Sequence, residues 1–205
     1  MTPFQAVSGV AVALLEDNVD TDAIAPLDVS RRPDYARMLF RRRRDAARAA
    51  GTPFVLDRPE FAPARILVAG ENFGCGSSRE SAVWALAAFG IRCVVARSFA
   101  DAFRQNCLRN GVLPVVPAAG DAAAFEQLVV AAGGTSTFGA DLRTQQLTAP
   151  GGVSFAFAID AHERTALLEG LDDIGLTLRL LPAIEAWEQR TRDAAPQLQI
   201  LERRT

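Results

Sequence analysis

The residues best suited to chemistry in this chain stand in one glycine-rich segment, GENFGCGSSRE, which covers residues 70–80. Its three glycines let the backbone bend sharply and come close to a bound group. Ser77 and Ser78 contribute hydroxyls, and Arg79 contributes a planar cation that matches a carboxylate or a phosphate. The segment therefore predicts a binding site for an anionic ligand.

The same segment has a purely structural interpretation, in which Ser77 or Ser78 caps a following helix. Arg79 favours a ligand, because an arginine in the first turn of a helix opposes the helix dipole. Two catalytic motifs are excluded here. Arg79 stands where a dinucleotide-binding fingerprint needs its third glycine, and Glu80 stands where a nucleophile elbow around Ser78 needs a glycine.

The composition excludes further catalytic mechanisms. All 22 basic residues are arginine, so a lysine Schiff base and a phosphate loop with a lysine are excluded. His162 is the only histidine, and one histidine builds neither a histidine metal site nor a two-histidine acid–base pair. Chemistry of those kinds must come from another molecule.

The net charge and the cysteine content indicate the cellular compartment of the protein and the kinds of partner that it binds. A net charge of -2 gives no overall attraction to nucleic acid or to an anionic membrane. Three widely spaced cysteines, Cys75, Cys93 and Cys107, form neither a disulfide framework nor a zinc ribbon, which suits a reducing cytosol. Apolar stretches are too short to span a membrane. We therefore expect a cytoplasmic protein with no nucleic-acid or membrane partner.

Alternating strands and helices must position the glycine-rich segment. The predicted order is strand 66–69, helix 78–89, strand 93–96, helix 99–108 and strand 112–116. This alternation indicates βαβ units on a parallel sheet. The glycine-rich segment then lies at the carboxyl end of a strand, where open α/β sheets usually bind ligands.

The rest of the chain predicts a mixed α/β fold. A strand over residues 10–14 ends in an acidic turn, residues 16–22, and residues 33–50 have the composition of a helix. Further elements are expected at 121–132 (helix), 136–138, 146–148 and 153–158 (strands), and 160–169 and 182–192 (helices). The three late strands look antiparallel, so the sheet is mixed or split into two layers. We expect one domain over residues 1–205.

Four stretches together resemble a known family. They are NVDTDAI at 18–24, the glycine-rich segment at 70–80, SFAD at 98–101 and GLDDIGLTL at 170–178. Their order and spacing resemble the small subunit of 3-isopropylmalate dehydratase, of the aconitase superfamily. The resemblance implies a swivelling β/β/α domain like the fourth domain of aconitase. It also implies a heterodimer with a large subunit that carries a [4Fe–4S] cluster, while this chain binds no cofactor or metal itself.

The resemblance further implies a reaction and its residues. Such enzymes isomerise 2-isopropylmalate to 3-isopropylmalate by loss and return of water, in leucine biosynthesis. The match gives Ser77 the role of catalytic base, and Ser78 and Arg79 that of binding a substrate carboxylate. Thr21 and Asp22 correspond to a second substrate-binding turn. An Asx-type turn cap remains an alternative role for Asp20 or Asp22.

Two departures from the family pattern leave alternatives open. Ser81 stands where the family usually has a histidine, and residues 25–50 differ from the usual substrate-facing loop. A related dehydratase for another substituted malate is therefore an alternative. A second alternative is a noncatalytic RNA-binding module, supported only by the run Arg41 to Arg44 with nearby arginines. Such a run is more typical of a solvated helix face or of a docking surface.

Overall fold

The computed structural model describes residues 2–27, 33–118 and 120–194. The chain divides into two compact units, Met1–Gly170 and Leu171–Thr205. The expectation of a single domain over residues 1–205 stays a prediction.

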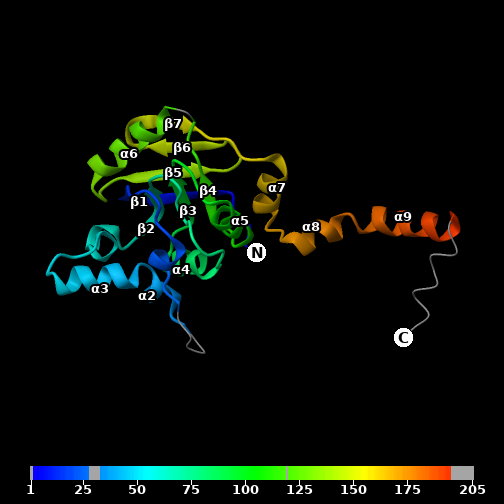
Figure 1. Cartoon of the computed structure of the whole chain (residues 1–205). Coiled ribbons are helices and arrows are strands. Elements are labelled where there is room, and N and C mark those ends of the chain that lie inside the picture. The colour runs from blue at the N-terminus through cyan, green and yellow to red at the C-terminus, as the bar shows by residue number, and fades with distance from the viewer. Residues whose placement is uncertain (1, 28–32, 119, 195–205) are drawn as a thin grey trace. The chain divides into compact units, whose positions relative to one another are not determined.

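The first unit is built on one mixed sheet of seven strands in the order β4-β3-β2-β1-β5-β6-β7 (Figure 1). Strands β1 to β4 pair in parallel, while β1 pairs antiparallel with β5 and the remaining pairs are antiparallel. The strands are β1 (Ala6–Leu14), β2 (Ala64–Ala69), β3 (Cys93–Ala96), β4 (Leu113–Val115), β5 (Thr137–Asp141), β6 (Gln146–Ala149) and β7 (Val153–Ala156). The predicted mixed sheet is confirmed, and its two halves share β1 instead of forming two layers.

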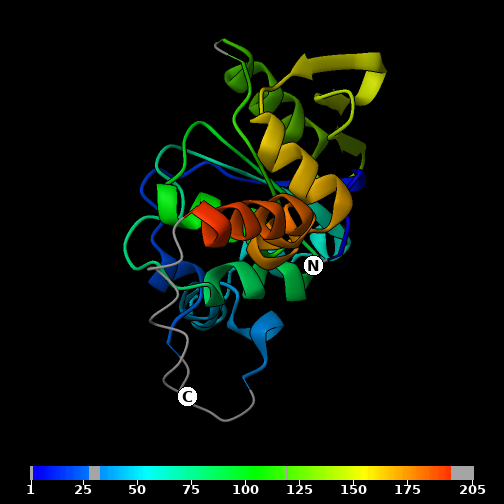
Figure 2. The ribbon, with the colours of Figure 1, turned by 90° about the vertical axis from the view of Figure 1, so that its right-hand side faces the viewer.

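The parallel half of the sheet is covered on both faces, as its apolar strands require. Neighbouring side chains of a strand point to opposite faces. Leu67 and Ala69 accordingly belong to one hydrophobic cluster, with helix α4 (Ser81–Phe89), and Ile66 and Val68 belong to a second, with helix α6 (Asp121–Ala132). In two views the strands β5 to β7 and the helices α2 and α3 lie at opposite ends of this unit (Figure 1, Figure 2).

Most predicted helices form, α6 with the predicted bounds and the others with shifted ends. The remaining α-helices are α1 (Thr21–Ile24), α2 (Tyr35–Met38), α3 (Arg41–Ala49), α5 (Asp101–Arg109), α7 (Ala161–Glu169), α8 (Asp173–Arg179) and α9 (Leu181–Ala194). Short 3-10 helices are η1 (Val55–Asp57), η2 (Pro59–Phe61) and η3 (Pro150–Gly152). The sequence analysis missed α8, whose start is capped by Asp172 through a 2.7 Å bond from the Gly175 N–H. None of the helices within the described residues is both long and apolar enough to cross a membrane.

The predicted helix over residues 33–50 is wrong as a single element, because the chain breaks between α2 and α3. Leu39 and Phe40 are fully buried at the break, and Phe40 has a φ of 50°. The Phe40 N–H donates to the Ile24 carbonyl at 2.7 Å. A left-handed residue costs about 1–2 kcal/mol, similar to what burial of a large apolar side chain contributes. Packing of the phenylalanine therefore overrides the helical composition.

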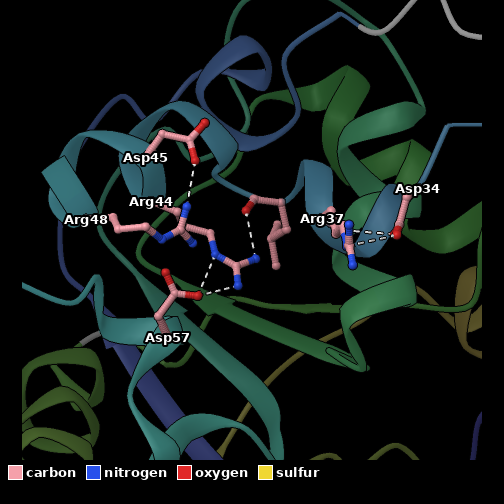
Figure 3. A network of polar contacts seen from close by, with 7 residues as sticks. Asp34, Arg37, Arg44, Asp45, Arg48 and Asp57 are labelled. Atoms are coloured by element: carbon pink, nitrogen blue, oxygen red, sulfur yellow. Dashed lines mark hydrogen bonds and ion pairs between the residues drawn. The ribbon is translucent and has the colours of Figure 1, made fainter.

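Two arginines of the run on α3, Arg43 and Arg44, pair with carboxylates, and Figure 3 shows the pair of Arg44. Arg44 binds Asp57 of η1 and Arg48 binds Asp45 at 3.0 Å. Arg43 reaches Glu16, in the loop after β1, at 2.7 Å. The pairs of Arg43 and Arg44 attach α3 to the body of the first unit, whereas Arg48 and Asp45 pair within α3. The first two pairs explain two of the four arginines in the run by local structure, without a nucleic-acid ligand.

Two bidentate ion pairs attach the outer helices α6 and α7. Glu126 of α6 is nearly buried and accepts two bonds from Arg97, at 2.8 and 2.6 Å, which raise the pKa of the arginine. Glu163 of α7 accepts two bonds of 2.7 Å from Arg104 of α5, and these lower the pKa of the carboxyl. Forked pairs of this kind fix orientation as well as contact.

Candidate functional site

The glycine-rich segment follows β2 and meets the acidic turn that follows β1. Because β1 and β2 are parallel neighbours, their carboxyl ends lie at the same edge of the sheet. Four backbone hydrogen bonds join the two loops, from the N–H groups of Gly70, Asn18, Gly74 and Thr21 to the carbonyls of Glu16 (3.2 Å), Glu71 (2.8 Å), Val19 (2.8 Å) and Cys75 (2.9 Å). The two motifs thus form one structure.

A third loop, which follows β3, holds the segment from its other side. The Phe73 N–H donates to the Ser98 carbonyl at 3.1 Å, and the Ala100 N–H donates to the Phe73 carbonyl at 3.1 Å. The Ser98 hydroxyl accepts a 2.8 Å bond from the Asn72 N–H. The SFAD motif therefore lies against the glycine-rich segment, and three sequence motifs converge on one place.

Gly74 is required by close packing as well as by backbone conformation. Its φ is +79°, and a Cβ built there would lie 2.1 Å from the ring of the buried Phe103. Gly76 also has a positive φ, +88°, but its nearest neighbour to a Cβ is 3.5 Å away. A comparison of alanine variants at the two positions therefore separates the cost of backbone strain from the cost of a steric clash with Phe103.

We expect Gly74→Ala to lower the free energy of unfolding by about 2–5 kcal/mol, because strain and overpacking add. Gly76→Ala is the matched control and should cost only the backbone part, about 1–2 kcal/mol. Urea unfolding followed by circular dichroism measures both. Equal losses in the two variants would show that contact with Phe103 does not matter.

Ser77 and Ser78 are exposed, and their backbone carbonyls are held from beneath. The Thr21 hydroxyl donates to the Ser77 carbonyl at 2.9 Å, and the Asn106 amide donates to the Ser78 carbonyl at 3.0 Å. Thr21 is 2% exposed and Asn106 is 6% exposed. Thr21 thus lies under the serines, and its predicted contact with substrate stays a prediction.

Asn106 was not among the candidate residues, although the sequence shows it as a polar residue on the apolar face of a predicted helix. It stands on α5 between Phe103 and Cys107, which are both buried in the core. An amide on the apolar face of a helix needs a hydrogen-bond partner. The sequence alone does not show that this partner is the carbonyl of Ser78.

Arg79 does not lie in a helix, which corrects one argument of the sequence analysis. Helix α4 begins at Ser81, with Glu80 at its N-cap and no side-chain cap bond. The capping role considered for Ser77 or Ser78 is therefore wrong, and the dipole argument for Arg79 does not apply. The chain leaves the helical path because Thr21 and Asn106 bind the two serine carbonyls.

Arg79 pairs instead with Asp22, one of the two predicted residues of the acidic turn. The guanidinium Nη2 contacts the Asp22 carboxylate, while the buried Nε has no hydrogen-bond partner among the described residues. Asp20 takes the alternative role, because its carboxylate caps α1 through a 2.5 Å bond from the Ala23 N–H. Of the two residues considered for a turn cap, Asp20 and Asp22, it is therefore Asp20 that forms one.

A mostly apolar pocket of about 400 Å³ opens beside Arg79. Its lining residues are Leu27, Pro33, Tyr35, Met38, Arg79, Glu80, Ser81 and Trp84. The rings of Tyr35 and Trp84 meet edge to face at 5.3 Å, and the Trp84 indole N–H donates to Asn110 at 2.9 Å. A cation at the side of an apolar pocket suits a carboxylate that carries a hydrocarbon substituent.

Cys75 is a free thiol within the glycine-rich segment, whereas Cys93, Cys107 and His162 lie elsewhere. Burial raises the pKa of the Cys93 and Cys107 thiols, so they are core residues and not nucleophiles. His162 is exposed at the start of α7, where the Asp160 carboxylate accepts a 2.8 Å bond from the backbone N–H of His162. No group of three His, Cys, Asp or Glu side chains within the described ranges is placed to hold a metal ion.

Comparison with known proteins defines first the class and then the family. A family model for the aconitase C-terminal domain matches residues 1–119. The model for the C-terminal domain of the 3-isopropylmalate dehydratase small subunit matches residues 173–200. The fold and the loops around Ser77 therefore define an aconitase-type domain of the α/β class.

Individual relatives identify the family within this class. The 3-isopropylmalate dehydratase small subunit of Sinorhizobium fredii is 46% identical over 96% of this chain and 99% of its own length. That of Rhizobium meliloti is 44% identical with the same coverage. A crystal structure of 3-isopropylmalate dehydratase from Methanocaldococcus jannaschii matches with a TM-score of 0.59 and 28% identity, over 88% of this chain and 99% of that one. The chain belongs to the family of 3-isopropylmalate dehydratase small subunits.

Proposed function

We propose that this chain, assembled with a larger subunit, interconverts 2-isopropylmalate and 3-isopropylmalate by loss and return of water. The observation that carries the proposal is the exposed Ser77, two residues from an arginine that borders an apolar pocket. Family membership supports the same reaction, since the relatives are named for it. We place the reaction in leucine biosynthesis and the protein in the cytoplasm, where its free cysteines remain reduced.

Substrate binding follows from the charge and shape of the site. Arg79 binds one carboxylate of the substrate, and Asp22 orients the guanidinium from the opposite loop. The apolar walls, among them Leu27, Met38 and Trp84, accept the branched alkyl substituent. Ser78, next to Arg79, contributes a hydroxyl toward the same carboxylate.

Ser77 carries the proton in this mechanism. As an alkoxide it takes the proton from the carbon beside a carboxylate while the hydroxyl leaves from the neighbouring carbon, and an alkene forms. Ser77 returns the proton when water adds back with the opposite regiochemistry. The [4Fe–4S] cluster that we expect on the larger subunit would supply Lewis acidity toward the departing hydroxyl. We assign no metal ligand to this chain.

The alternative that residues 25–50 suggested, a related dehydratase for another substituted malate, is not favoured. Eight relatives with 42–46% identity over nearly the whole chain are named 3-isopropylmalate dehydratase small subunit. Residues 28–32 of that stretch lie outside the described residues. Ser81, which replaces the usual histidine, lies in the lining of the pocket.

The test is an assay of the reconstituted complex. The chain is combined anaerobically with the cluster-bearing large subunit from the same genome and given malate derivatives with hydrogen, methyl, ethyl or isopropyl substituents. We expect the highest kcat/KM with isopropyl, read as alkene absorbance, and no turnover by this chain alone. A complex that prefers another substituent would refute the assignment of substrate, and failure to form any complex would refute the two-subunit mechanism.

A further inference from the structure

Two buried side chains control the backbone of the segment that carries the proposed catalytic base. The Thr21 hydroxyl and the Asn106 amide each donate to one carbonyl, of Ser77 and Ser78 respectively, at 2.9 and 3.0 Å. Thr21 comes from α1 and Asn106 from α5, so they reach the segment from separate elements. Consecutive peptide units are thereby fixed from below.

Fixing these carbonyls also fixes the direction of two N–H groups. The described chain contains no cis peptide bond, and in a trans peptide the carbonyl and the following N–H point in opposite directions. Because Thr21 and Asn106 hold the carbonyls on the buried side, the N–H groups of Ser78 and Arg79 point toward the exposed side. Within the described residues, neither N–H makes a hydrogen bond to the protein.

These two donors suit an anion beside Ser77. A serine side-chain oxygen commonly accepts from backbone N–H groups two or three residues ahead of it, and the Arg79 N–H stands two residues ahead of Ser77. Hydrogen bonds to a charged oxygen favour its charged form and lower its pKa. Donors held in advance need no reorganisation when the charge develops.

We infer that Thr21 and Asn106 are positioning residues that aim the Ser78 and Arg79 N–H groups at the Ser77 alkoxide. This role rests on the proposed function of Ser77 as the base. It differs from the predicted contact of Thr21 with substrate, because the buried hydroxyl acts through the backbone of the catalytic segment. It also gives Asn106 a function that its place on an apolar helix face does not otherwise explain.

The test uses paired variants in the assembled two-subunit enzyme. Thr21→Val keeps the shape and removes the donor, and Thr21→Ser keeps the donor. Asn106→Asp keeps the shape and replaces the donating amide by a carboxylate oxygen. The readouts are kcat, KM, the pH dependence of kcat and the thermal midpoint of the complex.

We expect Thr21→Val to lower kcat about tenfold, the effect of one lost hydrogen bond to a critical group. Asn106→Asp should lower kcat by at least as much, because its carboxylate oxygen also repels the Ser78 carbonyl. The KM should change less than about threefold, because the contacts to substrate remain. The rising limb of the pH profile should move to higher pH, since the serine ionises less readily. Thr21→Ser should restore both kcat and the profile.

Several outcomes would overturn this role. A valine variant that loses thermal stability while kcat and the pH profile stay normal would show a structural function only. A serine variant as impaired as valine, or a loss confined to KM, would contradict action through the donor. An inactive wild-type complex with every substituted malate would instead refute the proposed function, and this role with it.

Discussion

Replacing Ser77 by alanine should lower kcat of the assembled enzyme by about 10²- to 10⁴-fold, the usual contribution of a positioned acid–base group. Ser77 is exposed, and its carbonyl contact with Thr21 does not depend on its side chain. The stability of the chain should therefore change by less than about 0.5 kcal/mol. Alkene formation in the reconstituted complex and urea unfolding of the chain measure the two quantities separately.

Ser78→Ala is the matched control for that experiment, because Ser78 is the exposed neighbour with the same side chain. We expect it to act mainly on KM, by about tenfold, since one hydrogen bond to a bound carboxylate is lost. If Ser78→Ala abolished kcat and Ser77→Ala did not, the proton-transfer role would belong to Ser78.

Arg79→Lys should lower kcat/KM by about 10²- to 10³-fold, although the charge is kept. The ammonium of lysine cannot bind a carboxylate with two parallel hydrogen bonds, so it loses both orientation and binding energy. In the structure, Arg79 uses Nη2 for Asp22 while the buried Nε has no partner among the described residues. Because Nε is buried, we expect a substrate carboxylate to bind the guanidinium at its Nη end, beside the contact with Asp22.

Asp22→Asn tests how the arginine is held, with the substrate contact left in place. The neutral amide can still accept a hydrogen bond, and so we expect a smaller loss in kcat/KM, of about threefold to tenfold. Steady-state kinetics on both variants with 2-isopropylmalate provide the comparison. A lysine variant with nearly normal kcat/KM would show that Arg79 does not bind the substrate carboxylate.

The elements that were predicted well are those whose signal is local. Strand β3 and helix α6 have the predicted bounds, 93–96 and 121–132, because a short apolar run and a glycine-bounded helical segment specify them without distant partners. The mixed character of the sheet also followed from the change between helix-separated and turn-separated strands. That all seven strands form one sheet did not follow, because strand order depends on long-range pairing through β1.

The wrong boundaries lie where distant contacts override local preference. Residues 33–50 have helical composition, yet the burial of Phe40 breaks them into α2 and α3. The helix expected from residue 78 begins at Ser81, because side chains from α1 and α5 hold the preceding carbonyls in another conformation. Tertiary hydrogen bonds and packing each contribute energies that exceed helix propensity at single positions.

By itself, the sequence determined the family and singled out the segment around Ser77 as the candidate site, since residue types at fixed spacing can be identified without knowledge of the fold. Only the tertiary structure decided that Asp22 pairs with Arg79, that Asp20 is a cap and that Asn106 belongs to the site. The Asp20 cap is local, with its partner Ala23 three positions ahead, whereas the Asp22–Arg79 and Asn106–Ser78 contacts join residues 57 and 28 positions apart in the chain. Such partners are chosen by which loops the parallel pairing of β1, β2 and β3 brings to one edge of the sheet.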